Sequence, residues 1–134
     1  MTDALRDRLE LAAEGLLFST ESDRPFEFIR LGAREAVESL TPARVAEMVG
    51  RPDDRAAEWP LSRFLARHIE RADVHDARAQ ALVPRYEDLE SALRTALGTI
   101  RVFRIGAVEI QVLAIGNDPA TGELAGLATV AVET

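Results

Sequence analysis

The N-terminal segment has the hydrophobic pattern of an amphipathic helix. Apolar residues return every three to four positions, which is the spacing of one buried helix face, until Gly15 interrupts the pattern. Thr2 or Asp3 can cap the first turn with a side-chain oxygen. The pattern therefore predicts a helix over residues 3–13.

The middle of the chain contains weaker helix signals. Thr41 followed by Pro42 combines a capping residue with a first-turn proline, and predicts a short helix that ends near Gly50. Residues 51–60 are polar and carry two prolines, so we predict a loop there. Residues 61–69 are predicted to be helical.

The clearest helical stripe precedes the last third of the chain. Its apolar positions are Leu89, Leu93, Ala96 and Leu97. Charged residues mainly occupy the opposite side, as expected for a helix with one solvent-exposed face. Pro84 suits a first turn and Gly98 a stop, so a helix is predicted to begin near Pro84 and to end before Gly98.

From residue 99 onward the hydrophobic period changes to two. The segments "TIRVFRIG", "AVEIQVLAIG" and "ELAGLATVAVET" are separated by Gly106-Ala107 and by "GNDPATG", both of which favour tight turns. They predict a C-terminal antiparallel meander, and Phe26 to Leu31 predict one more strand. Because the strands are apolar on both faces, we expect helices on both sides of the sheet. The predicted fold class is α+β, in a single domain over residues 1–134.

Composition excludes several function classes. The 134 residues include no Cys, which excludes disulfides, thiolate catalysis and Cys-based zinc sites. The net charge of −7 opposes direct binding of nucleic acid, which requires a basic surface. No apolar stretch is long enough to span a membrane, and the charged N-terminus differs from a signal peptide. We therefore expect a cytoplasmic protein that binds neither nucleic acid nor membranes.

The sequence does not predict catalysis. His68 and His75 are seven residues apart, too far to share a metal without a third ligand, and are interpreted as exposed histidines. The turn "GNDPATGE" lacks the spaced carboxylates of a calcium loop. Neither a nucleophile elbow nor a glycine-rich phosphate loop occurs. We expect no enzyme activity and no cofactor.

Two segments together resemble the nuclease A inhibitor family. They are "GLLFSTESDRPFEF" near the start and "FRIGAVEIQVLAIGNDPATGELAGLATVAVET" at the end, with "RYEDLESAL" as a weaker match between them. Residues 32–80 give no clear match. The resemblance implies a three-layer α-β-α sandwich, similar to pathogenesis-related proteins. It also implies that the chain is a protein inhibitor of a sugar-non-specific, metal-dependent DNA/RNA endonuclease.

The resemblance further implies which residues bind the nuclease. Thr134 matches a C-terminal threonine that engages the divalent metal of the nuclease active site, and this is the only metal that the chain is expected to contact. Glu21 matches an acidic residue that pairs with nuclease arginines. The other expected contacts are Glu133, Ser22, Asp23 and His75. Because one cleft must receive Glu21 and Thr134, we expect the first loop and the last strand to share one edge of the molecule.

The chemistry of a nuclease site is compatible with this assignment. Mg²⁺ prefers oxygen ligands and keeps positions open for phosphate, so the oxygens of Thr134 can replace a scissile phosphate. Glu21 can replace a flanking phosphate opposite an arginine. The family also presents an aromatic residue from a mid-chain loop. This residue is absent from "RADVHDARAQ", and Trp59 lies too early to replace it simply.

Two alternatives stay open. The chain can be a small-ligand or metal-binding domain of the same fold with no nuclease partner, or a minor hydrolase that uses its acidic loops. Both require convergent polar groups in a pocket. A protruding surface shared by Glu21 and Thr134 favours inhibition, whereas a pocket around them favours ligand binding.

Overall fold

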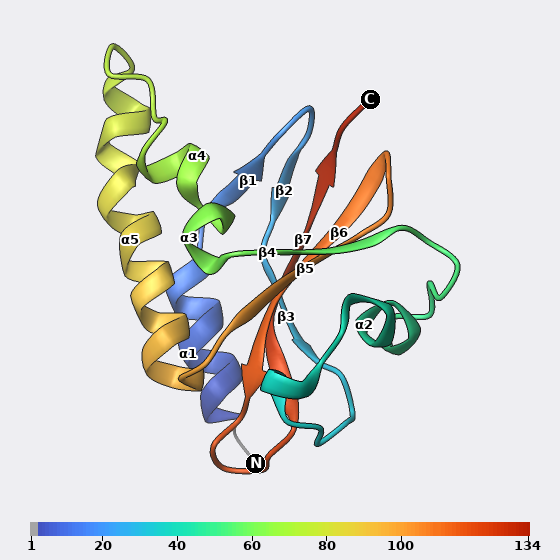
Figure 1. Ribbon diagram of the computed structural model, residues 1–134. Helices are drawn as coiled ribbons and strands as arrows, with labels where there is room; N and C mark the ends of the chain where they lie inside the picture. The colour runs from blue at the N-terminus through green and yellow to red at the C-terminus, as the bar shows by residue number, and fades with distance from the viewer. Residues whose placement is uncertain (1–2) are drawn as a thin grey trace.

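The computed structural model describes residues 3–134 as an α+β protein (Figure 1). The described helices are α1 (Ala4–Ala13), α2 (Pro42–Met48), α3 (Leu61–Phe64), α4 (Ala66–Ile69) and α5 (Ala77–Leu97), together with the 3-10 helix η1 (Val37–Ser39). The strands are β1 (Leu17–Ser19), β2 (Asp23–Pro25), β3 (Glu27–Arg30), β4 (Ala56–Trp59), β5 (Arg101–Ile105), β6 (Glu109–Asn117) and β7 (Leu124–Val132). Among these described helices, none combines the length and the apolar character that crossing a membrane requires.

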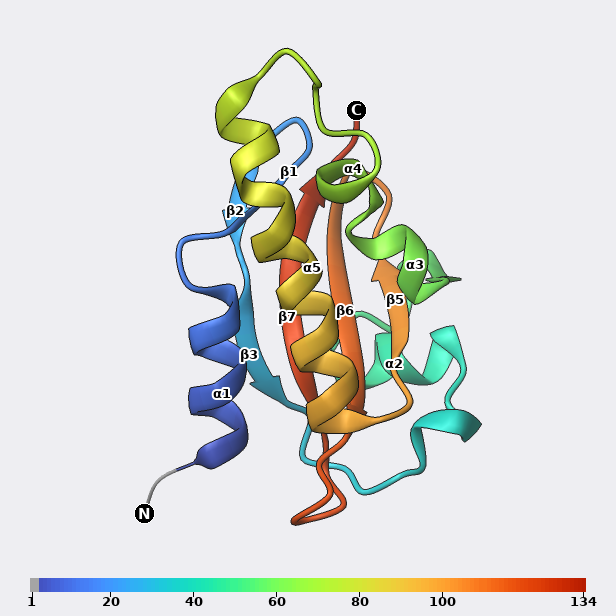
Figure 2. The ribbon, with the colours of Figure 1, turned by 90° about the vertical axis from the view of Figure 1, so that its left-hand side faces the viewer.

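The main sheet has five antiparallel strands in the order β3-β7-β6-β5-β4. Its centre is the predicted meander of β5, β6 and β7, which is confirmed, as is the predicted strand before residue 31. β1 and β2 form a separate antiparallel hairpin. The turn of this hairpin lies beside the end of β7 (Figure 2). The first loop and the last strand therefore share one edge of the molecule, as expected.

Both faces of the sheet are covered. On one face α1 and α5 pack against the sheet, in a cluster that includes Leu9, Leu89, Leu93, Val112 and Leu127. On the other face η1, α2 and their flanking loops complete a cluster that includes Val37, Val45, Phe103 and Leu113. Burial on both faces explains why the strands are apolar on both sides. The likeness to pathogenesis-related proteins stays a prediction.

Side-chain caps define the starts of α1 and α2. Asp3 accepts a hydrogen bond from the backbone N–H of Arg6 at 3.1 Å, and Thr41 accepts one from that of Arg44 at 3.2 Å. These caps satisfy N–H groups that the helices themselves leave unpaired. Both predicted starts are confirmed, and the alternative cap Thr2 lies outside the described residues.

The predicted start of α5 is wrong. The helix begins at Ala77, where the side chain of Asp76 accepts hydrogen bonds from the N–H groups of Arg78 and Ala79 at 3.0 and 3.1 Å. Pro84 lies inside the helix, where it has no N–H to donate and leaves one helical carbonyl without its usual partner. Capping by the aspartate and packing of the apolar face outweigh this loss.

Three further expectations need correction. The predicted loop over residues 51–60 contains the edge strand β4, in which Trp59 pairs with Val102 of β5. The predicted helix over residues 61–69 is two short helices that meet at Leu65. The first loop, which carries Glu21, is only the turn of the β1–β2 hairpin over residues 20–22, because the residues on either side of it are strands.

Candidate functional site

The β1–β2 hairpin is anchored in the core by Phe18. This side chain is 2% exposed and its ring stacks on that of Phe64, with the ring centres 5.8 Å apart. Phe26 meets the Phe18 ring edge-on at 6.0 Å. Three packed aromatic rings hold the base of a hairpin that would otherwise be only marginally stable.

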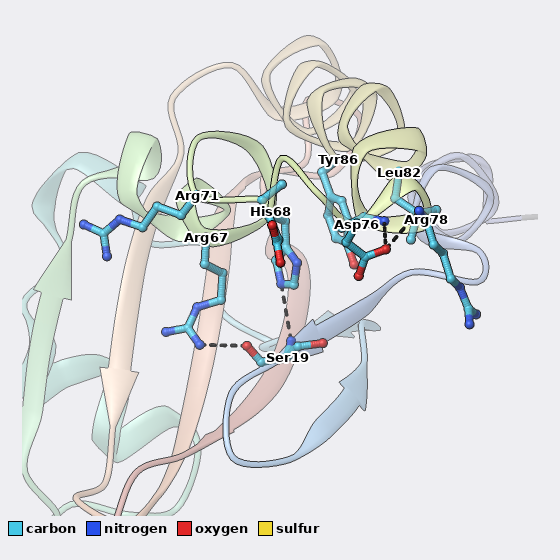
Figure 3. A pocket seen from close by; sticks show the side chains of 11 residues that line it. Ser19, Arg67, His68, Arg71, Asp76, Arg78, Leu82 and Tyr86 are labelled. Carbon is cyan, nitrogen blue, oxygen red and sulfur yellow. Dashed lines mark hydrogen bonds between the residues drawn. The ribbon is translucent and has the colours of Figure 1, made fainter.

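Side chains of helix α4 hold the same hairpin through the backbone of Ser19 in β1. The N–H of Ser19 donates to Nε2 of His68 at 3.3 Å, and the carbonyl of Ser19 accepts from Nη1 of Arg67 at 2.7 Å (Figure 3). Tyr86 of α5 stacks on His68 at 4.2 Å and donates its hydroxyl to the carbonyl of Leu17 at 2.6 Å. These contacts set the position of the turn that follows β1.

His68 is therefore a structural histidine in a partly buried position, and its interpretation as an exposed residue is wrong. Burial, with a smaller effect from the neighbouring Arg67, lowers the pKa of His68 to about 4. Asp23 opposes this shift weakly. The imidazole is neutral at physiological pH, which is the state required for Nε2 to accept a hydrogen bond.

We expect His68→Gln to change the pH dependence of stability. Folding lowers the pKa of His68 from 6.5 to about 4, so the unfolded chain binds a proton in this interval that the folded protein does not. As the pH falls from about 6.5 to about 4, the contribution of His68 should therefore lower the free energy of unfolding of the parent. Below about pH 4 His68 should cause no further decrease. With allowance for partial exposure, the loss is on the order of 2 kcal/mol.

Gln can accept the same hydrogen bond but does not titrate, so the variant should lack this decrease. Denaturant unfolding of the two proteins at several pH values measures the difference, and carboxylates common to both cancel. Parallel pH profiles would show that the hydrogen bond to Ser19 does not require a neutral imidazole.

The turn of the hairpin brings Glu21 and Thr134 into direct contact. Oε2 of Glu21 accepts from the backbone N–H of Thr134 and Oε1 accepts from its hydroxyl, each at 2.6 Å. The strand before Thr134 is held as well, because the N–H of Val132 donates to Oγ1 of Thr20 at 2.9 Å. The sequence positions are 113 residues apart, yet both side chains are exposed at one end of the molecule.

These hydrogen bonds stabilise the charged form of Glu21. The hydroxyl and then the amide of Thr134 lower the pKa of Glu21 below its ordinary value, against a small opposing effect of desolvation. The carboxylate is thus ionised at neutral pH. The hydroxyl gives its only proton to Glu21, so both lone pairs of Oγ1 remain available for an external ligand.

Glu133 is held by a residue of β5 and by the turn that follows β5. Its carboxylate pairs with Nη2 of Arg104 at 2.5 Å, and its N–H donates to the carbonyl of Val108 at 2.9 Å. The Arg104 guanidinium lies over the ring of Trp59 at 3.9 Å, and Arg63 lies over the same ring at 4.1 Å. Trp59 thereby supports the end of β7, a role that its position in the sequence does not indicate.

The other expected contact residues are distributed differently. Asp23 is exposed at the start of β2. Ser22 is half-buried, and its hydroxyl oxygen has no solvent exposure and no hydrogen-bond partner among residues 3–134. His75 is exposed in the loop before α5, where its N–H donates to Asp73 at 2.9 Å. In the described chain no hydrogen bond connects Ser22 or His75 to Thr134.

A separate cavity of about 460 Å³ lies between α4 and the start of α5 (Figure 3). Arg67, Arg71 and Arg78 lie around it together with Asp76, and Ser19 forms part of its wall. Figure 3 shows Arg71 and Arg78 pointing to opposite sides rather than into a common centre. Glu21 and Thr134 are not among its lining residues.

The fold and this site define an α+β domain that presents an ionised carboxylate and a hydroxyl at an exposed end. A family model described as "Nuclease A inhibitor-like protein" matches residues 3–134, which is nearly the whole chain. The chain therefore belongs to the nuclease A inhibitor-like family, as its resemblance to that family indicates. A comparison with curated proteins gave no match.

Proposed function

We propose that this protein inhibits a sugar-non-specific, metal-dependent DNA/RNA endonuclease by inserting the end formed by Glu21, Glu133 and Thr134 into its active site. The observation that carries this proposal is the pair of 2.6 Å hydrogen bonds between Glu21 and Thr134 at an exposed end of the fold. The family of the chain supplies the class of partner. Inhibition is proposed to occur in the cytoplasm.

The chemistry follows from what each group can still bind. The lone pairs of Thr134 Oγ1 can occupy an open position on the nuclease metal, a hard cation that prefers oxygen ligands. The Glu21 carboxylate uses one acceptor site on each oxygen for Thr134 and retains others. It can therefore also accept from a nuclease arginine, as a phosphate would. The two residues together imitate the bound substrate.

The overall charge assists encounter with such a site. A phosphate-binding cleft is positively charged, and the chain has a net charge of −7. Attraction between opposite charges accelerates association, with an effect that weakens as salt screens it. Asp23 lies next to the turn that carries Glu21 and adds to the negative charge there.

Ligand binding without a nuclease partner is the second candidate, because the cavity beside Ser19 has the size of a small-molecule site. Its central polar groups, however, are engaged in holding β1, as Arg67 and His68 both bond to Ser19. Within residues 3–134 no group of three His, Asp or Glu side chains is arranged to hold a metal ion. Inhibition is the better supported function.

An inhibition assay tests the proposal. The purified protein is titrated into nuclease A and into other non-specific DNA/RNA endonucleases, with Mg²⁺ present and DNA or RNA as substrate. We expect stoichiometric loss of activity for at least one enzyme, and no nuclease activity from the protein alone. Full activity of the whole panel at excess inhibitor, together with metal-dependent turnover by the purified chain, would contradict the proposal.

A further inference from the structure

The two hydrogen bonds between Glu21 and Thr134 fix the orientation of the Thr134 side chain as well as its distance from Glu21. Both donors of Thr134, the amide N–H and the hydroxyl, are directed at the two oxygens of one carboxylate. A threonine hydroxyl rotates freely in water, so its proton and lone pairs have no fixed direction. Here two short bonds fix the side-chain rotamer and the direction of the proton together, which leaves the lone pairs facing away from Glu21.

We propose that Glu21 is a positioning residue for Thr134, whose hydroxyl it orients and polarises as a ligand for the partner's metal ion. This inference rests on the proposed function. A carboxylate that accepts the proton of a metal ligand holds that ligand in place and increases its electron density, as second partners of metal-bound histidines do. Glu21 then contributes through Thr134 as well as through its own charge.

The surrounding contacts favour this role. The N–H of Glu21 approaches the carbonyl of Val132 at 3.4 Å, and the hydroxyl of Thr20 accepts from the N–H of Val132 at 2.9 Å. Arg104 holds Glu133 from the other side at 2.5 Å. Val132 and Glu133, the two residues before Thr134, are thus each held by a contact of their own. An end held on both sides loses less conformational freedom on binding than a free tail, which favours tight association.

Glu21→Gln is the informative substitution, because it preserves size while it removes one acceptor. A glutamine amide offers one oxygen and one NH₂ group, so it cannot accept from both donors of Thr134. If its NH₂ faces the hydroxyl, Oγ1 becomes an acceptor and spends a lone pair on the amide. Glu133→Gln is a matched control, since it weakens the tether to Arg104 but leaves the hydroxyl of Thr134 untouched.

The first test needs no nuclease. In the free protein at neutral pH the amide proton NMR resonance of Thr134 should lie downfield, because its N–H donates to the charged Glu21 carboxylate at 2.6 Å, and this downfield shift should be absent in Glu21→Gln. It should persist in Glu133→Gln. A Thr134 resonance that is insensitive to Glu21 would overturn the inference without affecting the proposed function.

The second test is a double-mutant cycle of Glu21→Gln and Thr134→Val, measured as affinity for Mg²⁺-loaded nuclease A or another enzyme that the parent inhibits. With Thr134 present we expect Glu21→Gln to weaken binding about tenfold. In the Thr134→Val background the same change should weaken binding by a clearly smaller factor, because the direct contact of Glu21 with the partner is still lost but no hydroxyl remains to be oriented.

Equal losses in both backgrounds would mean that Glu21 acts on the partner alone, and the inference would be wrong while the proposed function stands. If neither substitution changes affinity, the proposed site itself is wrong. The two results are distinguishable, because only the second leaves Thr134→Val without effect.

Discussion

Thr134→Val is expected to weaken binding to the nuclease by roughly 30-fold or more in Mg²⁺, with an unchanged thermal midpoint. Valine has nearly the shape of threonine but has no oxygen to offer the metal. Loss of one member of a desolvated polar contact at an interface typically costs about 2–5 kcal/mol, mostly through faster dissociation. Because Thr134 is exposed, the free energy of unfolding should change by no more than about 0.5 kcal/mol.

Thr134→Ser is the matched control, since it retains the hydroxyl that donates to Glu21. We expect its affinity to stay within about threefold of the parent. Addition of several residues after Thr134 should weaken binding as strongly as Thr134→Val, because the extension blocks close approach to the metal. Titration calorimetry with and without chelator measures these effects, and the loss in Thr134→Val should shrink when the metal is removed. Parent-like inhibition by Thr134→Val would exclude the hydroxyl as a metal ligand.

The elements with a continuous pattern were predictable from sequence. Helix α1 and the meander each combine a clear apolar period with a local cap or turn, and helix α2 is marked by its capping Thr41 and the proline that follows, so local and tertiary preferences agree. Strand β4 has no such signal: it has four residues at the edge of the sheet, and only pairing with β5 makes it a strand. The start of α5 at Ala77 was not predicted, because proline is more common at a helix start than in a helix interior and Pro84 therefore indicates a later start.

The site was predictable only in part, and for a different reason. Glu21 and Thr134 follow from the family resemblance, whereas hydrophobic patterning contains no information about a contact across 113 positions. The hydrogen bonds between them depend on a three-residue turn whose position is set by Phe18, Arg67 and His68. The supporting role of Trp59 likewise depends on strand order, because β4 must lie beside β5 before Trp59 can meet Arg104.

Gly126→Ala is expected to destabilise the fold by about 3 kcal/mol or more, the largest stability change among the substitutions considered. Gly126 lies in β7 and pairs with Ile115 of β6. A methyl group at this position would overlap the carbonyl oxygen of Ala114 and lie 3.0 Å from Cα of Ile115. Both obstacles are backbone atoms of a paired strand, so no side chain can rotate to make room. The strands β6 and β7 would have to move apart at the centre of the sheet.

Gly122→Ala provides the comparison, because it adds the same methyl group in the turn that joins the same two strands. There the added atom meets nothing within 4 Å, but the backbone has φ near 80°, which costs an alanine about 1–2 kcal/mol. In thermal unfolding we expect Gly126→Ala to lower the midpoint by about 10 °C or more, and Gly122→Ala by clearly less. Equal shifts of the midpoint would mean that β6 and β7 do not approach as closely at Gly126 as the structure indicates. The small side chains of β7 would then not be required for close packing of the two strands.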